Sequence, residues 1–392
     1  MNAVISHPLF VPILVTIVII AAFPLVAGYI VLVERKVLAD FQVRLGPMRV
    51  GPHGLLQPIA DALKLLLKED IIPAESDKAI FWFAPCVSTI TGLTAFAVLP
   101  FSQSIYVADV NVGLLVVSAA SAVGILGIIL GGWSSNSHYS LLGALRSAAQ
   151  LVSYEVALSF ALLSGVMLAG TLSMRGIVEA QLRHGVWGVF DNYLFMIVPF
   201  AIYIIAATAE TNRAPFDLPE AESELVAGFH TEYSGFRWAL YFLAEYANIF
   251  VVSAVAVTLF WGGWLRPFPS VHWLEVPLNV GFPVILFVGS GVLTLPLIRK
   301  LKDPIQQKVL LLAALLLVAL AVPFIVPAVN AAIIGLFWFL LKVFTIVYLM
   351  IWFRGTFPRF RYDQLMNIGW KIAIPAGMGA VLVNALIGMA RS

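Results

Sequence analysis

The sequence predicts an all-α, polytopic membrane protein. Hydrophobic residues make up 61% of its 392 residues and charged residues only 11%, whereas soluble domains average about 45–50% and 25%. Apolar segments of about 20 residues, the length that a helix needs to cross a bilayer, recur along the whole chain. Because they show little strand-like alternation, a β-barrel is disfavoured. We expect residues 1–392 to form a single transmembrane domain.

Ten apolar segments bounded by charges or by Pro/Gly clusters are candidate spans. A helix pairs every backbone N–H and C=O within the segment, as hydrocarbon requires. The first segment is too long for the apolar region of a signal peptide and no clear cleavage site follows it, so we expect a retained span. The ten are residues 10–33, 79–101, 113–132, 147–172, 192–210, 239–263, 277–298, 309–328, 331–353 and 371–389.

Lys and Arg are distributed unevenly between alternate loops. They are frequent in loops 34–78, 133–146, 299–308 and 354–371, whereas the alternate loops contain only Arg175, Arg183 and Arg266. Since loops rich in Lys and Arg stay on the cytoplasmic side, we expect both termini outside and the acidic loop 210–238 in the cytoplasm. A bacterial cell (inner) membrane is the expected location, with the mitochondrial inner membrane as the alternative.

Residues that hold redox cofactors are scarce. Cys86 is the one cysteine, so this chain alone builds neither a disulfide framework nor a Cys-ligated iron-sulfur cluster. The six histidines lie far apart in the sequence, and no Gly-rich nucleotide loop connects a strand to a helix. We therefore expect no metal site and no bound cofactor in this chain, and any redox centres on partner subunits.

The first cytoplasmic loop, residues 34–78, contains an amphipathic helix. Gln57, Asp61, Lys64 and Lys68 recur at helical spacing, and leucines fill the opposite side. Such a helix lies in the membrane interface. Two roles are open for it: a surface anchor, or a helix that also lines a pocket.

The loop 210–238 concentrates acidic residues between two spans. Asp217 and Glu220 match a capping-box spacing that starts a short helix through Glu222 and Glu224. Glu220 and Glu224 are four residues apart and share a helix face, where two carboxylates tend to hold a proton between them.

The acidic loop is either a solvated surface or a buried functional cluster. The first reading suits an arbitrary run of charges. Apolar neighbours such as Phe216 and Phe229 favour burial, and Arg213 is a built-in counter-ion. We therefore prefer a buried, functional acid cluster.

Three further charged residues lie inside predicted spans, namely Glu155, Glu245 and Lys342. A charge at the centre of a membrane helix costs about 2.5–3.5 kcal/mol on insertion scales, so such residues usually mark an ion path or a ligand site. Glu155 and Glu245 also fit structural groups that reach the interface, an alternative that is harder to sustain for the deeper Lys342.

Several long motifs occur in a fixed order: ERK at 34–36, QxRxGP at 42–47, GLLQPIADALKL at 54–65, SYE at 153–155, ETNRAPFDLPEAESELVAGF at 210–229, TEYSG at 231–235 and RYDQLM at 361–366. In these motifs the chain resembles, over almost its whole length, the quinone-site membrane subunit of respiratory complex I. This subunit is called H in the bacterial NADH:quinone oxidoreductase and 1 in mitochondria.

The resemblance implies a function without a redox centre. In that family the subunit anchors the peripheral arm, and its helices enclose a tunnel for a lipid-soluble quinone, the substrate. FMN and the iron-sulfur clusters belong to partners, and the peripheral-arm subunits also supply the quinone headgroup site. Reduction drives proton translocation through small membrane-arm subunits toward antiporter-like ones. Lipid is the other expected contact, and nucleic acid is not expected.

The resemblance also assigns roles to individual residues. For the quinone tunnel they are Arg35, Arg44, Asp61, Lys64, Arg213, Phe216, Arg354 and Arg361. For proton coupling they are Glu155, Glu210, Asp217, Glu220, Glu222, Glu224, Glu232 and Glu245, and Lys342 joins them by its position near the middle of a span. No residue is assigned to redox chemistry itself.

The chain departs from the family pattern in one region. The family has a core of about eight spans, and residues 277–328 add two. Because the insertion adds an even number of spans, the orientation of everything after it is unchanged.

Two other functions compete with this one. The first keeps the fold but changes the electron donor, as in a related formate-, hydrogen- or ferredoxin-linked complex. The second is a stand-alone ion transporter, which inverted repeats would support, but the sequence has no convincing internal repeat. The full PFDLPEAESE run at 215–224 favours the quinone enzyme.

Overall fold

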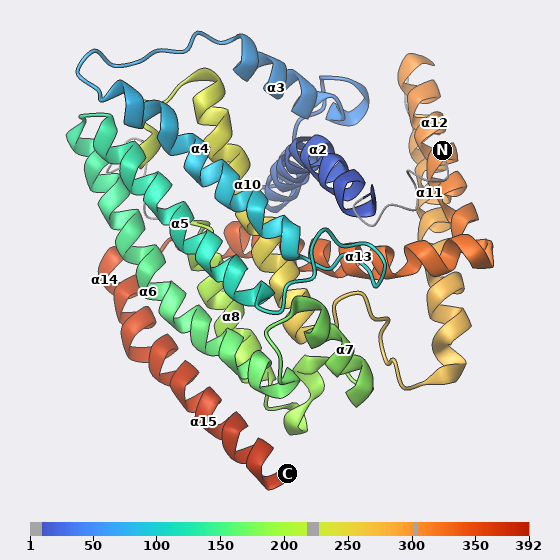
Figure 1. Ribbon diagram of the computed structural model, residues 1–392. Helices are drawn as coiled ribbons and strands as arrows, with labels where there is room; N and C mark the ends of the chain where they lie inside the picture. Colours follow the sequence, from blue (N-terminus) through green and yellow to red (C-terminus); the bar gives the residue numbers. More distant parts are fainter. Residues whose placement is uncertain (1–9, 218–226, 301–303, 392) are drawn as a thin grey trace.

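The computed structural model describes residues 10–217, 227–300 and 304–391 (Figure 1). Across these residues it is helical with no strand, and nine helices are long and apolar enough to cross a membrane. A shorter apolar helix, α8 (Ile197–Glu210), is the tenth. The predicted all-α, polytopic fold with about ten spans is confirmed.

The chain begins with a long helix, α2 (Phe10–Phe41), and an interfacial one, α3 (Gln57–Leu67). Because α2 continues well past its apolar stretch, Glu34 and Arg35 lie on a helix rather than in the loop that follows. The next helix, α4 (Lys78–Ala95), starts where the Asp77 side chain accepts hydrogen bonds from the amides of Ala79 and Ile80. This is an N-cap, which satisfies donors that the first helical turn leaves free.

The bundle at the centre consists of α4, α5 (Gly113–Ser134), α6 (His138–Ala169), α8 and α10 (Gly235–Phe260). Small residues let these helices approach closely, as is typical of membrane helices. A Cβ on Gly127 of α5 would lie 2.2 Å from Ser88 Oγ of α4, and one on Gly143 of α6 would lie 2.7 Å from the backbone of Gly228. Helix α10 is the most buried span, since 78% of its apolar window is covered.

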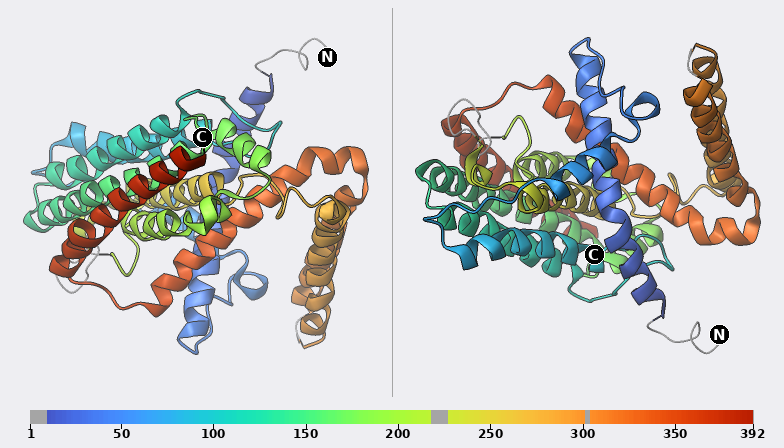
Figure 2. Two further views of the ribbon diagram at one scale, coloured as in Figure 1. Left: turned by 90° about the horizontal axis from the view of Figure 1, so that it is seen from below. Right: turned by 90° about the horizontal axis from the view of Figure 1, so that it is seen from above.

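Two long helices of the C-terminal part pack on the bundle, with short helices between them. Helix α13 (Pro327–Thr356) runs across the bundle and packs on α2 and α10. After α14 (Tyr362–Asn367) and the π-helical turn η8 (Ile368–Ala373), α15 (Ile374–Arg391) lies along α6 (Figures 1 and 2). The short helix α7 (Met174–His184) covers the end of the bundle where α6 finishes.

The region predicted as an insertion contains a helical hairpin, α11 (Phe282–Lys300) and α12 (Pro304–Ile325). The hairpin stands to one side of the bundle, joined to it by α13 (Figure 2). A π-helical turn, η7 (Pro277–Gly281), precedes it and is fixed to α13 by the Asn330 side chain, which donates to Asn279 O at 3.3 Å.

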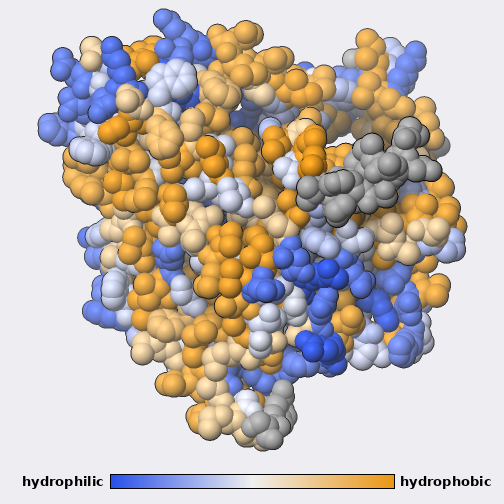
Figure 3. Space-filling model, in the orientation of Figure 1, coloured by the Kyte–Doolittle hydropathy of each residue, from blue (hydrophilic) through white to orange (hydrophobic). Residues whose placement is uncertain are grey.

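The surface matches a membrane environment. Figure 3 shows a mainly hydrophobic face, with hydrophilic residues gathered near the α3–α4 end and around α7. Many large apolar side chains are more than half exposed, for example Ile285, Leu293 and Leu386. Such exposure is unfavourable in water and neutral in hydrocarbon.

Candidate functional site

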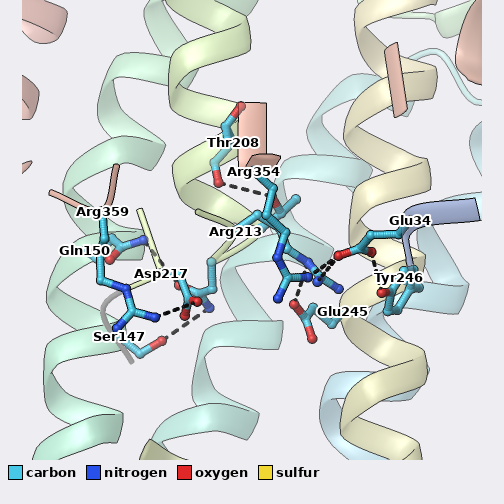
Figure 4. Close-up of polar contacts among 12 residues, drawn as sticks. Glu34, Ser147, Gln150, Thr208, Arg213, Asp217, Glu245, Tyr246, Arg354 and Arg359 are labelled. Carbon is cyan, nitrogen blue, oxygen red and sulfur yellow. Dashed lines mark hydrogen bonds and ion pairs between the residues drawn. The ribbon is translucent and has the colours of Figure 1, made fainter. Parts of the chain in front are cut away.

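A buried group of charged residues lies where α2, α10 and α13 meet the segment after α8. We call Glu34, Arg213, Glu245, Tyr246 and Arg354 the Glu34 cluster (Figure 4). Glu34 is only 4% exposed. Its carboxylate accepts a hydrogen bond from Tyr246 Oη at 2.6 Å and pairs with Arg213 Nη1 at 3.2 Å and with Arg354.

Arg213 connects the two carboxylates of the Glu34 cluster. Its Nε lies 2.8 Å from Glu245 Oε1, and its guanidinium lies over the Tyr246 ring, 4.6 Å from the centroid. Two arginines thus face two glutamates, so the charges of the cluster balance. Removing one partner of a buried ion pair costs about 3–5 kcal/mol, because the other charge is left uncompensated.

The segment after α8 is held in place by α6. Gln150 donates hydrogen bonds to Ala209 O and Phe216 O, both at 2.8 Å, and Asn212 donates to Ser147 Oγ at 3.3 Å. These bonds fix the turn that carries Arg213, and Arg359 pairs with the buried Asp217 at 3.1 Å.

The Phe216 side chain is buried on the α6 side of this turn. Its ring packs between Tyr154 and Phe360, with centroid distances of 5.6 and 5.5 Å. The Phe360 amide donates to Pro215 O at 3.0 Å, which joins the turn to the segment before α14.

A small cavity of about 70 Å³ lies beside the cluster, between α4, α5, α8 and α10. We call it the polar cavity, because two carboxylates and an imidazole line it among apolar side chains. Glu210 and Glu245 line it, and the Ser121 hydroxyl donates to Glu210. His230 also lines it, and burial lowers the pKa of this imidazole to about 4 against the opposing effect of the Asp217 carboxylate. The ring is therefore neutral near pH 7.

A larger cavity of about 390 Å³ lies between α2, α3 and α10. We call it the apolar cavity, because its walls are mainly aliphatic and aromatic. At one end Arg35 Nη1 lies 2.8 Å from Asp61 Oδ2, and Gln57 donates to Asp61 Oδ1 at 2.8 Å. The interfacial helix α3 therefore contributes to the wall of a cavity.

The two cavities lie on opposite sides of α10. Trp238 and Phe242 line both of them, so these two side chains stand between the apolar and the polar space. Their rings stack at 5.0 Å, and Phe242 in turn contacts the ring of Tyr246 at 4.8 Å.

Not every predicted residue joins these features. Arg44 and Lys64 are exposed, and so is Arg361, which pairs with Asp363 at 3.4 Å. Glu155 on α6 is half-buried and interacts electrostatically with Glu210, and Glu232 is half-buried just before α10. The predicted helix at Glu220, Glu222 and Glu224 lies outside the described residues.

Lys342 occupies a separate buried site on α13. Its Nζ donates to Trp261 O at 2.7 Å and to Leu265 O at 2.9 Å, and it lies 4.8 Å from the Trp187 ring. Trp261 directly follows α10, so the Lys342 amine caps the C-terminal end of that helix by donating to a carbonyl left without a helical partner.

Several residues of the site were not selected from the sequence, among them Glu34, Gln150, Tyr246 and Arg359. Glu34 had a detectable signal, since it is an acidic residue directly after an apolar run that a helix could extend. Gln150 and Tyr246 lie in apolar helices and carry no charge, so hydropathy alone does not distinguish them.

Comparison with known proteins identifies the family. The family model for NADH dehydrogenase matches residues 13–385. The NADH-quinone oxidoreductase component designated H 2 in Solibacter usitatus (strain Ellin6076) is 82% identical over 389 residues, covering 99% of each chain. The chain belongs to the NADH dehydrogenase family, as a complex I membrane component of the H type.

More distant relatives agree with this assignment. The component designated H 1 in Koribacter versatilis (strain Ellin345) is 49% identical and covers 96% of this chain and 92% of its own. Subunit 8 of the Rhodothermus marinus enzyme is 43% identical over 97% of both chains. All three are named for NADH-quinone oxidoreductases, rather than for complexes linked to formate, hydrogen or ferredoxin. The chain is therefore a multi-pass membrane subunit of an NADH-quinone oxidoreductase.

Proposed function

We propose that this subunit guides a quinone along the apolar cavity and couples its reduction to proton translocation through carboxylates on the far side of α10. The observation that carries the proposal is the placement of the two cavities. One is apolar, bordered by α3, and large enough for part of a lipid-soluble molecule. The other is polar and holds Glu210 and Glu245 within one helix diameter of it.

Partner subunits supply the redox chemistry in this proposal. Electrons pass from NADH through FMN and iron-sulfur clusters of the peripheral arm to a quinone whose headgroup those subunits bind. The membrane subunit contributes the path of the quinone, to which Arg35 and Asp61 belong. Arg44, Lys64 and Arg361, which are exposed, would contact the peripheral arm near the mouth of that path.

Coupling would begin at the Glu34 cluster. Reduction of a quinone to a quinol takes up two electrons and two protons. A carboxylic acid of the subunit that supplies one of these protons becomes negatively charged, and the new charge changes the balance that Arg213 holds with Glu34 and Glu245. Coulomb interactions are strong in a medium of low dielectric constant, so this change alters the proton affinity of neighbouring carboxylates. Glu210, Glu155 and Glu232 would continue the path toward small membrane-arm subunits and the antiporter-like ones.

The acidic loop and the deep lysine keep their proposed roles. Glu220 and Glu224 would share a proton that responds to quinone reduction, with Asp217 and Glu222 beside them. Lys342 would tie the path to the segment that follows α10, where it contacts the carbonyl oxygens of Trp261 and Leu265.

The polar cavity offers a medium for proton transfer. A water needs roughly 10–15 Å³ of such space, so about five would fit in its volume. Glu210 Oε2 and Ser88 Oγ are buried and lack a hydrogen-bond partner within the described part of the chain, and water would satisfy both.

The test of coupling replaces one carboxylate at a time by its neutral amide. Glu210→Gln, Glu245→Gln, Glu220→Gln and Glu224→Gln are each assayed in membrane vesicles for NADH-driven quinone reduction and for protons moved per electron. We expect a fall in both quantities. Glu179→Gln, on the exposed surface of α7, is the control. Wild-type turnover and stoichiometry in all four variants would reject the proposal.

The test of the quinone path fills the apolar cavity. Ala62 lines it from α3, so Ala62→Phe adds a ring to its interior. We expect quinone reduction to fall several-fold, while NADH oxidation by a hydrophilic acceptor that draws electrons from the peripheral arm is unchanged. Equal quinone reduction in wild type and variant would place the path elsewhere.

A further inference from the structure

We propose that Trp238 and Phe242 of α10 form an insulating wall between the apolar and the polar cavity, and that this wall prevents protons from crossing between them. We call Trp238, Phe242 and Tyr246 the aromatic stripe. The inference rests on the proposed function and adds to it an element that determines pumping efficiency rather than quinone binding.

The geometry of the stripe is continuous. Its members are four residues apart, so their side chains lie on one face of α10. Ring centroids are separated by 5.0 Å between Trp238 and Phe242 and by 4.8 Å between Phe242 and Tyr246. The stripe begins near His230, 6.4 Å from the Trp238 ring, and ends at the Tyr246 hydroxyl that bonds Glu34.

The position of the stripe separates two different environments. Trp238 and Phe242 contact both cavities, while their neighbours on α10 contact only one: Leu243 lines the apolar cavity and Glu245 the polar cavity. Glu34, Glu245 and Arg213 gather at the end of the stripe where Tyr246 lies. The rings of Trp238 and Phe242 thus separate the apolar cavity, which suits alkyl chains, from the polar cavity, which suits water.

An aromatic partition suits a proton barrier. Protons move along chains of hydrogen-bonded water and polar groups, and a Phe ring supplies neither donor nor acceptor. A pump needs its internal carboxylates closed to one side of the membrane while they are open to the other. Water that joined the two cavities would let Glu245 and Glu210 exchange protons with the quinone path at any stage of the pumping cycle. The expected result is slip: electrons flow but fewer protons are moved.

Packing alone also explains aromatic residues at helical spacing, so the test must separate the two roles. Phe242→Ala and Trp238→Ala remove one ring each. We expect the number of protons moved per electron to fall about two-fold or more in the assembled enzyme. This ratio is normalised to electron flow, so it is read independently of any change in quinone turnover. Phe242→Leu, which keeps an apolar side chain of similar size, should retain most of the ratio.

Leu243→Ala is the matched control. It opens space only toward the apolar cavity, so its proton-to-electron ratio should equal that of wild type. A wild-type ratio in Phe242→Ala, Trp238→Ala and Phe242→Leu would overturn the proposal. If the alanine variants do not assemble, Phe242→Ser, Phe242→Val and Phe242→Leu form a graded series. The proposal would likewise be overturned if the proton-to-electron ratio did not fall as the side chain at position 242 becomes smaller.

The outcome for the wall is distinguishable from the outcome for the proposed function. If Glu210→Gln and Glu245→Gln reduce pumping but the wall variants do not, coupling through these carboxylates stands and the wall fails. If the two carboxylate variants pump normally, the proposed function itself fails.

Discussion

Glu34 is the residue on which the buried cluster depends, because three side chains converge on its carboxylate. Glu34→Gln preserves shape but removes the charge that balances Arg213 and Arg354. The cost of leaving buried charges uncompensated is about 3–5 kcal/mol. We expect quinone reduction to fall at least ten-fold, measured as NADH-driven turnover per assembled complex in native membranes.

Tyr246→Phe is the graded companion of this variant. It removes one hydrogen bond to a charged group, worth about 1.5–3 kcal/mol, and leaves both arginines paired with Glu34. Its turnover should lie between those of wild type and Glu34→Gln. If Tyr246→Phe were the more severe of the two, the hydroxyl rather than the charge balance would control the cluster.

The sequence predicts some members of the Glu34 cluster but not others, because only some of them show a local pattern. Arg213 and Glu245 are ionisable groups beside or within apolar runs, a pattern that indicates function. Glu34, which pairs with Arg213, is separated from its other partner Arg354 by 320 residues. A contact over that distance in the chain depends on how α2 and α13 pack, which no local pattern contains.

At the scale of elements, α3 is fastened to the start of α10. Arg237 is 3% exposed, and its Nη2 lies 2.8 Å from Asp70 Oδ2 in the segment after α3. The guanidinium also lies 4.3 Å from the Trp82 ring, and the Ser234 hydroxyl accepts from the Ile71 amide at 2.9 Å. These contacts set the position of the helix that borders the apolar cavity.

We expect Arg237→Leu to loosen α3 and so change quinone access more than catalysis. The KM for quinone should rise about three-fold or more while kcat changes less, as measured in steady-state assays of the solubilised complex. Arg237→Lys should restore part of the affinity, because it keeps the charge opposite Asp70. A fall in kcat at constant KM would show that Arg237 does not act through the cavity.

The elements themselves were largely predictable. Membrane spans depend on apolar length, and the polar spacing of residues 57–68 is local, so both can be read from the sequence. The extension of α2 through Glu34 and Arg35 was not expected, because charged residues after an apolar run usually mark the start of a loop. Glu34 is buried against Tyr246 of α10 and Arg354 of α13, and the exposed Arg35 pairs with Asp61 of α3, so both charges of the longer helix have partners.

At the scale of the whole molecule, the hairpin of α11 and α12 is separate from the proposed machinery. Within the described residues, neither helix contributes a side chain to the Glu34 cluster, the apolar cavity or the polar cavity. Its connection to the rest runs through α13, η7 and the 3-10 turn Pro52–Gly54. Its outer surfaces are apolar, which suits contact with lipid or an accessory subunit.

Deletion of residues 282–325 tests this independence. The ends left by the deletion are already neighbours, since Asn330 bonds Asn279 O at 3.3 Å. Removing two spans also leaves α13 in its original orientation, because an even number of crossings is lost. We expect the complex to assemble and to retain at least half of its quinone turnover and its full proton stoichiometry.

Deletion of α11 alone is the matched control, because the loss of one span requires α13 to insert in the opposite direction. Glu34 would then lose Arg354 and α10 would lose the Lys342 cap, so we expect no assembled, active enzyme. A topology reporter at the C-terminus should report opposite sides for the two deletions. If the complex without α11 and α12 assembles but no longer reduces quinone, the hairpin takes part in the reaction. Its independence from the two cavities would then be contradicted.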